Sequence, residues 1–188
     1  MKKIMQTVKQ NKYLIISCMI LTYGIIIGTF LIKFIPENLC EKIFALIANN
    51  HPSLKTKFFD LFIMSFSVLT LEFIFGMNLC GNLINNVILF FNGIVLGICK
   101  SINFYYLGTN FILDSAIEYF TYTVFVEFVI ILMAESALKF SKQLLIEINQ
   151  NGEKNSIKFK NYIVKYITFT CIIIIFSFLS AYISYIFL

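Results

Sequence analysis

The sequence contains no arginine and few charged side chains of any kind. All fifteen of its basic residues are lysine, and charged residues make up only 13% of the 188 positions, about half of the usual fraction. So few charges cannot cover the surface of a water-soluble domain, which excludes an ordinary soluble protein. Apolar residues account for 59% and the mean hydropathy is +0.85. We therefore predict an all-α polytopic membrane protein, built as a single integral membrane domain over residues 1–188.

The exclusive use of lysine indicates an AT-rich coding bias and carries no functional information. The net charge of +5 is typical of a protein with lysine-rich cytoplasmic loops, so we expect no nucleic acid among the partners. Membrane lipids are the expected surroundings.

Motifs for catalysis and for metal binding are also scarce. His51 is the only histidine, which excludes an HExxH zinc pair, and no P-loop or GxSxG elbow occurs. A Ser–His pair would have to use His51, which lies in a loop beside Pro52. The cysteines show no CxxC spacing, and we interpret them as small core residues: Cys18, Cys40, Cys80, Cys99 and Cys171. We expect no enzyme activity, no metal and no cofactor.

Five stretches with few or no charges are long enough to cross a membrane. The predicted spans are 13–32, 61–79, 81–99, 119–138 and 166–188. The first span has the basic start of a secretion signal, but it is too long and lacks a cleavage site, so we expect it to stay attached. Between the second and third spans the turn chemistry is supplied by Gly76, Asn78, Gly81 and Asn82.

The distribution of lysine favours an odd number of spans. Four lysines precede the first span and six lie between the fourth and the last. Five spans place these two segments on one side of the membrane, which is expected to be the cytoplasm. The N-terminus is then cytoplasmic, the C-terminus is extracytoplasmic, and the other side receives Lys33, Lys42, Lys55, Lys57 and Lys100.

The connection 34–60 is the largest predicted extracytoplasmic piece. Apolar residues recur at helical spacing in it, at Leu39, Ile43, Leu46 and Ile47. This pattern predicts a short amphipathic helix on the membrane surface, ending near 49–52, where Pro52 disfavours helix in the preceding residue.

Small and polar residues mark the faces on which the spans pack. In the third span Asn82, Asn86, Gly93 and Gly97 share one face, with Asn85 and Asn92 beside them. The first span carries a GxxxG pair at Gly24 and Gly28. We interpret both sets as close-packing faces rather than a permeation path. The glycine pairs fit packing within one bundle and equally a homo-oligomer.

Glu72 and Glu127 lie near the middle of their predicted spans. An acid at this depth costs about 2.5–3.5 kcal/mol on insertion scales, so it must be neutral, hydrogen-bonded or in contact with water. Ser65 and Gly76 share the face of Glu72, which points it inward towards the asparagines of the third span. The two acids are either protonated packing residues or a pair that handles protons or substrate. Glu135 is placed to pair with Lys139 at i+4, and Asp114 and Glu118 mark the outer entry to the fourth span.

The order of these features resembles the bacterial stage II sporulation protein M family of five-span membrane proteins. The segment 91–97, Phe-Asn-Gly-Ile-Val-Leu-Gly, is similar to the Asn-Gly-x-x-x-Gly stretch of the family's third span, and Glu127 is similar to the glutamate of its Pro-His-Gly-x-x-Glu segment. Tyr122-Thr123-Val124 stands where the family has Pro-His-Gly, so no role that depends on that histidine transfers.

The resemblance implies a non-catalytic component of the bacterial cell membrane. The sporulation member is a partner of two peptidoglycan-degrading proteins during engulfment, and related members occur with circular bacteriocins, where export, maturation or immunity is their expected role. A first hypothesis is therefore a membrane anchor that positions partner proteins. A second is a subunit of bacteriocin export or immunity, or a small transporter or channel, that uses Glu72 and Glu127.

Overall fold

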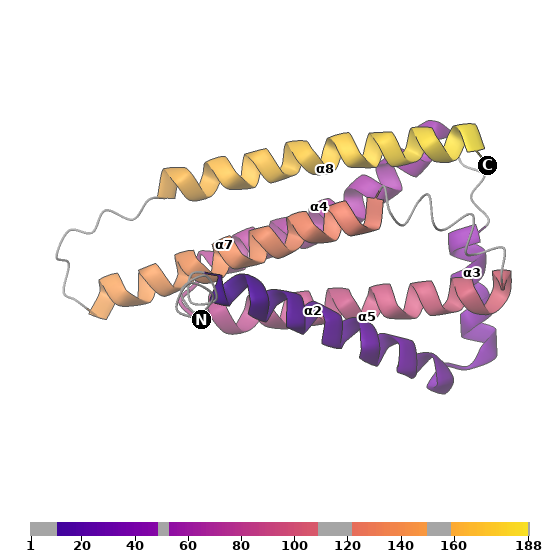
Figure 1. Ribbon diagram of the computed structural model, residues 1–188, viewed down its shortest axis with the longest axis horizontal. Helices are drawn as coiled ribbons and strands as arrows, with labels where there is room; N and C mark the ends of the chain where they lie inside the picture. The colour runs from indigo at the N-terminus through magenta and orange to yellow at the C-terminus, as the bar shows by residue number, and fades with distance from the viewer. Residues whose placement is uncertain (1–10, 49–52, 109–121, 150–158, 188) are drawn as a thin grey trace, which may run out of the picture.

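The computed structural model describes residues 11–48, 53–108, 122–149 and 159–187, and these residues form helices joined by short turns (Figure 1). The elements are α2 (Lys12–Leu31), the 3-10 turn η1 (Ile32–Phe34), α3 (Glu37–Ala48), α4 (Leu54–Gly76), α5 (Gly81–Leu107), α7 (Val124–Asn149) and α8 (Phe159–Phe187). The all-α prediction is confirmed.

Four helices in the described part of the chain are long and apolar enough to cross a membrane. They cover Lys12–Phe34, Leu54–Gly76, Gly81–Leu107 and Phe159–Ile183. The helix predicted as the fourth span over 119–138, α7, is not among them, because Glu127, Glu135 and Lys139 interrupt its apolar sequence. Residues 119–121 of that predicted span lie outside the described residues.

Several helices extend beyond the predicted spans, because the end of an uncharged run marks the membrane boundary and not the end of a helix. The start of α4 is seven residues earlier than predicted, since the Ser53 side chain accepts a hydrogen bond from the Thr56 backbone N–H at 3.5 Å. Lys100, expected in a connection, lies inside α5, and Lys165 lies inside α8. At its other end α4 stops at Gly76 instead of 79.

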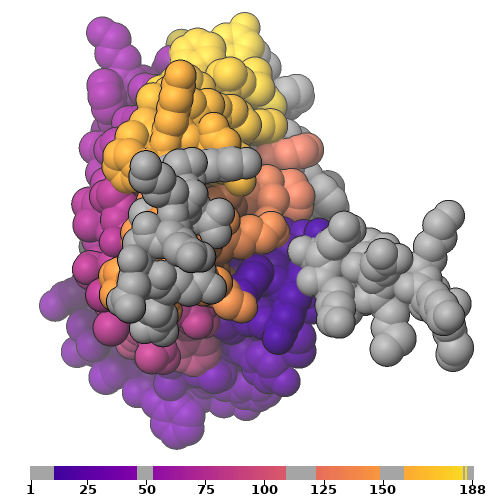
Figure 2. Space-filling view, turned by 90° about the vertical axis from the view of Figure 1, so that its left-hand side faces the viewer, coloured from indigo at the N-terminus to yellow at the C-terminus, as the bar shows by residue number. Residues whose placement is uncertain are grey.

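The long helices run roughly side by side, while α3 lies across one end of the bundle (Figure 1). The opposite end is the one at which α2 begins, α7 ends and α8 begins. Figure 2 looks onto that opposite end and shows α7 between α8 and α2. Contacts of α7 with α2, α4, α5 and α8 make it the central helix. The helix is buried on most sides from Val126 to Ser141, and within this range the acids Glu127 and Glu135 are more enclosed than Lys139, whose side chain is 43% exposed.

The closest approach of two backbones is between α2 and α5. A side-chain carbon added to Gly24 would lie less than 3.0 Å from the Phe90 carbonyl oxygen, and one added to Gly93 would meet the Leu21 carbonyl oxygen. Gly28 and Gly97 are in equally tight contact with the opposite helix. Only hydrogen fits in these positions, so the four glycines let the two helices pack backbone against backbone.

The buried face of α5 differs from the predicted one by a small rotation. We expected Asn82 and Asn86 to share the packed face, but Asn82 is exposed and Asn86 is half-buried. The buried polar positions are instead Asn85 and Asn92, which lie seven residues apart and on the same side. The reason is that α5 packs against α4 and α7 as well as α2, so its buried surface is wider than the glycine stripe alone.

Candidate functional site: a polar centre and its pocket

The polar centre of the bundle is formed by Asn92 of α5 and Glu127 of α7. The Asn92 side-chain amide donates a hydrogen bond to Glu127 Oε2 over 2.8 Å. These residues are 35 positions apart in the sequence and meet because α5 and α7 pack directly together. The structure thus brings two of the predicted intramembrane candidates into contact.

Glu72 lies close to this pair but makes no hydrogen bond of its own. Its side chain is 0% exposed, and neither carboxylate oxygen has a partner among the described residues. It is near enough to Glu127 for the two carboxyl groups to interact electrostatically. Asn85 is also 0% exposed, with both amide atoms unpartnered. Since an unpaired carboxylate is very costly in a water-free interior, the structure favours a neutral Glu72.

Tyrosine hydroxyls form hydrogen bonds between helices that we did not predict from the sequence. Tyr122 bonds to the Ser65 hydroxyl and donates to the Leu61 carbonyl oxygen, each over 2.5 Å. Tyr162 donates to the Phe73 carbonyl oxygen over 3.0 Å. A buried tyrosine needs a partner for its hydroxyl, and the many tyrosines of this chain were the available signal. Tyr122 therefore fixes the start of the α7 segment to α4.

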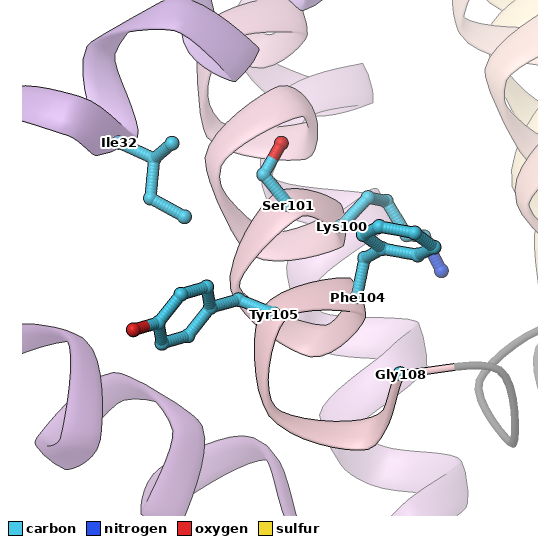
Figure 3. Close-up of a pocket in the computed structure, with 6 residues that line it drawn as sticks. All are labelled: Ile32, Lys100, Ser101, Phe104, Tyr105 and Gly108. Carbon is cyan, nitrogen blue, oxygen red and sulfur yellow. The ribbon is translucent and has the colours of Figure 1, made fainter.

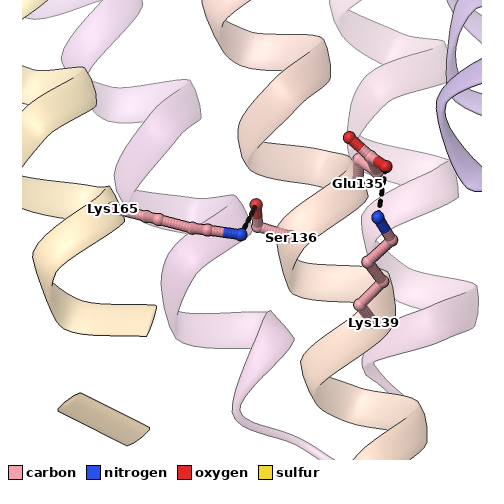
Figure 4. Close-up of polar contacts among 4 residues, drawn as sticks. All are labelled: Glu135, Ser136, Lys139 and Lys165. Atoms are coloured by element: carbon pink, nitrogen blue, oxygen red, sulfur yellow. Dashed lines mark hydrogen bonds and ion pairs between the residues drawn. The ribbon is translucent and has the colours of Figure 1, made fainter. Parts of the chain in front are cut away.

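A second group of polar contacts lies further along α7 (Figure 4). Lys139 Nζ pairs with Glu135 Oε1 over 2.5 Å, so the ion pair expected at i+4 is present. Lys165 of α8 donates a hydrogen bond to the Ser136 hydroxyl over 3.4 Å. These contacts stay on α7 or link it to α8, and none involves Glu127. Asp114 and Glu118, expected at the other end of this span, lie outside the described residues.

Two cavities flank α5. The first, of about 450 Å³, lies between α2, α5 and α7, and Glu127 is the acid in its wall; the other lining residues are Leu21, Ile25, Thr29, Leu96, Gly97, Lys100, Thr123, Val124, Phe125, Phe128 and Ile131. The second, of about 660 Å³, lies between η1 and the end of α5 (Figure 3). It is lined by Ile32, Lys100, Ser101, Phe104, Tyr105 and Gly108. The first has the composition of a ligand site, with mainly apolar walls and a few polar groups.

Metal chemistry has no support in the described part of the chain. No group of three or more histidine, cysteine, aspartate or glutamate side chains there could hold a metal ion. His51, the only histidine, lies outside the described residues. The chemistry open to the polar centre is binding of a proton or of a polar group at Glu127.

No family model, curated protein or solved structure matches this chain. The resemblance to the sporulation family therefore stays a prediction from the sequence, and function has to be inferred from the geometry of the bundle.

Proposed function

We propose that this chain is a non-catalytic membrane component that holds partner proteins at one face of a bacterial cell membrane. The observation that carries the proposal is the position of α3 across the end of the bundle. The ring of Phe44 in α3 stacks on that of Tyr106 in α5 with centroids 4.6 Å apart, and the Cys40 side chain of α3 is buried. Leu39 of α3 and the preceding Phe34 are left 46% and 82% exposed. A rigidly mounted helix with an apolar edge suits the docking of an extracytoplasmic protein.

The proposal includes five membrane crossings, with α7 as the fourth. At 1.5 Å per residue, the 26 residues of α7 extend about 39 Å, more than the roughly 30 Å of the hydrocarbon core. Its acids Glu127 and Glu135 are largely enclosed by other helices, which limits their contact with lipid. An odd number of crossings puts α3 and the C-terminal end of α8 on the extracytoplasmic side.

The resemblance to the sporulation family supplies the class of partner, namely peptidoglycan-remodelling enzymes that act during engulfment. Purification of the tagged protein from native membranes, followed by mass spectrometry, should recover such enzymes. The variant Phe34→Glu/Leu39→Glu should lose them while its yield in the membrane is unchanged, because both side chains are exposed. Gln143→Glu, an exposed position on α7 towards the opposite end, is the control and should keep them. Equal recovery with both variants would contradict a partner site on α3.

A second candidate function is supported by the position of Glu127 in the wall of a cavity. In this second candidate function, the chain is either a subunit for export of, or immunity to, a circular bacteriocin, or a small transporter. The polar centre of Glu72 and Glu127 then handles the cargo or its proton. Replacing both acids by glutamine should then abolish export or protection in cells while the protein still assembles in the membrane. Full activity of that variant would exclude this candidate.

A further inference from the structure

The walls of the 450 Å³ cavity combine an apolar surface with one carboxyl group. Glu127 lies in the first turn of α7 beside Leu96, Phe125 and Ile131, and its side chain is not fully buried. The Asn92 amide holds only Oε2 of this carboxyl group. The second oxygen, Oε1, is left for a group that enters the cavity.

The cavity opens on the side of the bundle. Its rim is formed by exposed side chains of α2 and α7, among them Thr29, Val124 and Phe128, while its deep wall contains the buried Gly97 and Ile131. A ligand therefore reaches Glu127 past apolar groups of the helix surface. Cavities of about 300–1,000 Å³ accommodate small organic molecules.

The charge at the cavity floor favours a cation. Glu127 is the acid among the residues that line the cavity, and the neighbouring Glu72, which is neutral, brings no positive charge. Lys100 also lines the cavity and opposes a cation there, but it lies more than two helical turns along α5 from Asn92, the residue that holds Glu127. A positive centre placed against Glu127 is thus nearest to an acid, in a medium of low dielectric constant where an ion pair is strong.

We propose that this cavity binds a lipophilic cation, with its positive centre at Glu127 and its apolar groups against α2 and α7. The site is independent of the anchoring role at α3, and it would supply the ligand class of the transporter candidate. A binding measurement on purified protein tests it without any assay of transport or of partner recovery.

Two probes of nearly the same shape and opposite charge are suited to the test. Tetraphenylphosphonium and tetraphenylborate are titrated separately into the full-length protein in dodecyl maltoside, with binding measured by equilibrium dialysis against detergent alone. The cation should bind at least about tenfold more tightly than the anion. A groove that only holds a lipid acyl chain would take up both probes equally, and that result would overturn the proposal.

Variants identify the site. Glu127→Gln keeps the shape of the side chain and an oxygen for Asn92, and it should weaken cation binding by about tenfold or more. Glu135→Gln removes an acid from the same helix but outside the cavity, and it should leave the affinity within about twofold. Thr123→Trp, which fills the cavity from its wall, should abolish binding in protein that still elutes as a single species. Unchanged binding in Glu127→Gln or in Thr123→Trp would overturn the assignment.

Discussion

The ammonium group of Lys142 lies 5.7 Å from the centroid of the Tyr13 ring, a cation–π contact between α7 and the start of α2. The contact fixes the beginning of the first membrane helix beside the later part of α7. Lys165, near the start of α8, donates a hydrogen bond to the Ser136 hydroxyl of α7. The start of α2, the later part of α7 and the start of α8, which border the two lysine-rich segments recognised in the sequence, therefore lie at one end of the bundle. The excess of lysine predicts that this end faces the cytoplasm.

Accessibility to a membrane-impermeant maleimide tests this topology. In a variant without the native cysteines, Asn11→Cys and Gln143→Cys should both react only after the cells are permeabilised, because both positions are exposed at the same end. Glu37→Cys, in α3 at the other end, should react in intact cells and serves as the control. Labelling of Asn11→Cys and Gln143→Cys from opposite sides would rule out five crossings.

The glycine contact between α2 and α5 predicts a large effect of small substitutions. Gly24→Leu or Gly93→Leu should lower the stability of the bundle by about 1–3 kcal/mol or more, since the added side chain must displace backbone atoms of the other helix. Tyr23→Leu, at a neighbouring position that is 58% exposed, should change it by less than about 0.5 kcal/mol. Both changes in stability are measured by thermal unfolding in detergent, which is monitored as the loss of the monodisperse species. A similar loss in Tyr23→Leu would argue against a specific contact.

Glu72 is expected to be destabilising where it stands. Neither of its carboxylate oxygens has a hydrogen-bond partner among the described residues, and the side chain is fully buried. Glu72→Met, of similar volume and without unpartnered polar atoms to bury, should raise the stability by about 1–3 kcal/mol. The same thermal measurement checks the sign. Destabilisation by methionine would mean that Glu72 makes a favourable interaction, and the structural interpretation of this acid would then fail.

The hydrogen bond between Asn92 and Glu127 should appear as a coupling energy. A double-mutant cycle of Asn92→Leu and Glu127→Leu is expected to give about 0.6 kcal/mol, the average for hydrogen bonds between membrane helices, and at most about 1.7 kcal/mol. A parallel cycle of Asn92→Leu with Glu135→Leu should give a value near zero, because Glu135 pairs with Lys139 instead. Strictly additive effects of the first pair would mean that the bond contributes nothing to stability.

The membrane helices could be located from the sequence because charges are rare in this chain and a lipid environment demands long apolar runs. The 13–32 stretch and α2 differ by one residue at the start. The ends of α4 and α8 were less predictable, since Lys55 and Lys160 lie within helices that extend past the apolar region. Hydropathy records where lipid ends, whereas a helix continues until a cap or a turn stops it.

The candidate site was likewise predictable from the sequence only in part. Glu72, Glu127 and the asparagines stood out in the sequence because polar groups are costly in a membrane. Which asparagine meets which glutamate was not predictable, because a rotation of α5 by one residue exchanges Asn86 for Asn85. Tyr122 was noticed only as a departure from the family motif, and its contact with Ser65 depends on a helix 57 positions away.

The sequence by itself determined that this is a helical membrane protein, where its apolar helices lie and which acids enter them, because these properties depend on composition along the chain. The tertiary structure decided that α7 is enclosed by its neighbours, that Asn92 pairs with Glu127 and that a cavity lies beside them. These features arise from side chains far apart in the sequence, and their contacts are set by the rotation and depth of each helix against its neighbours.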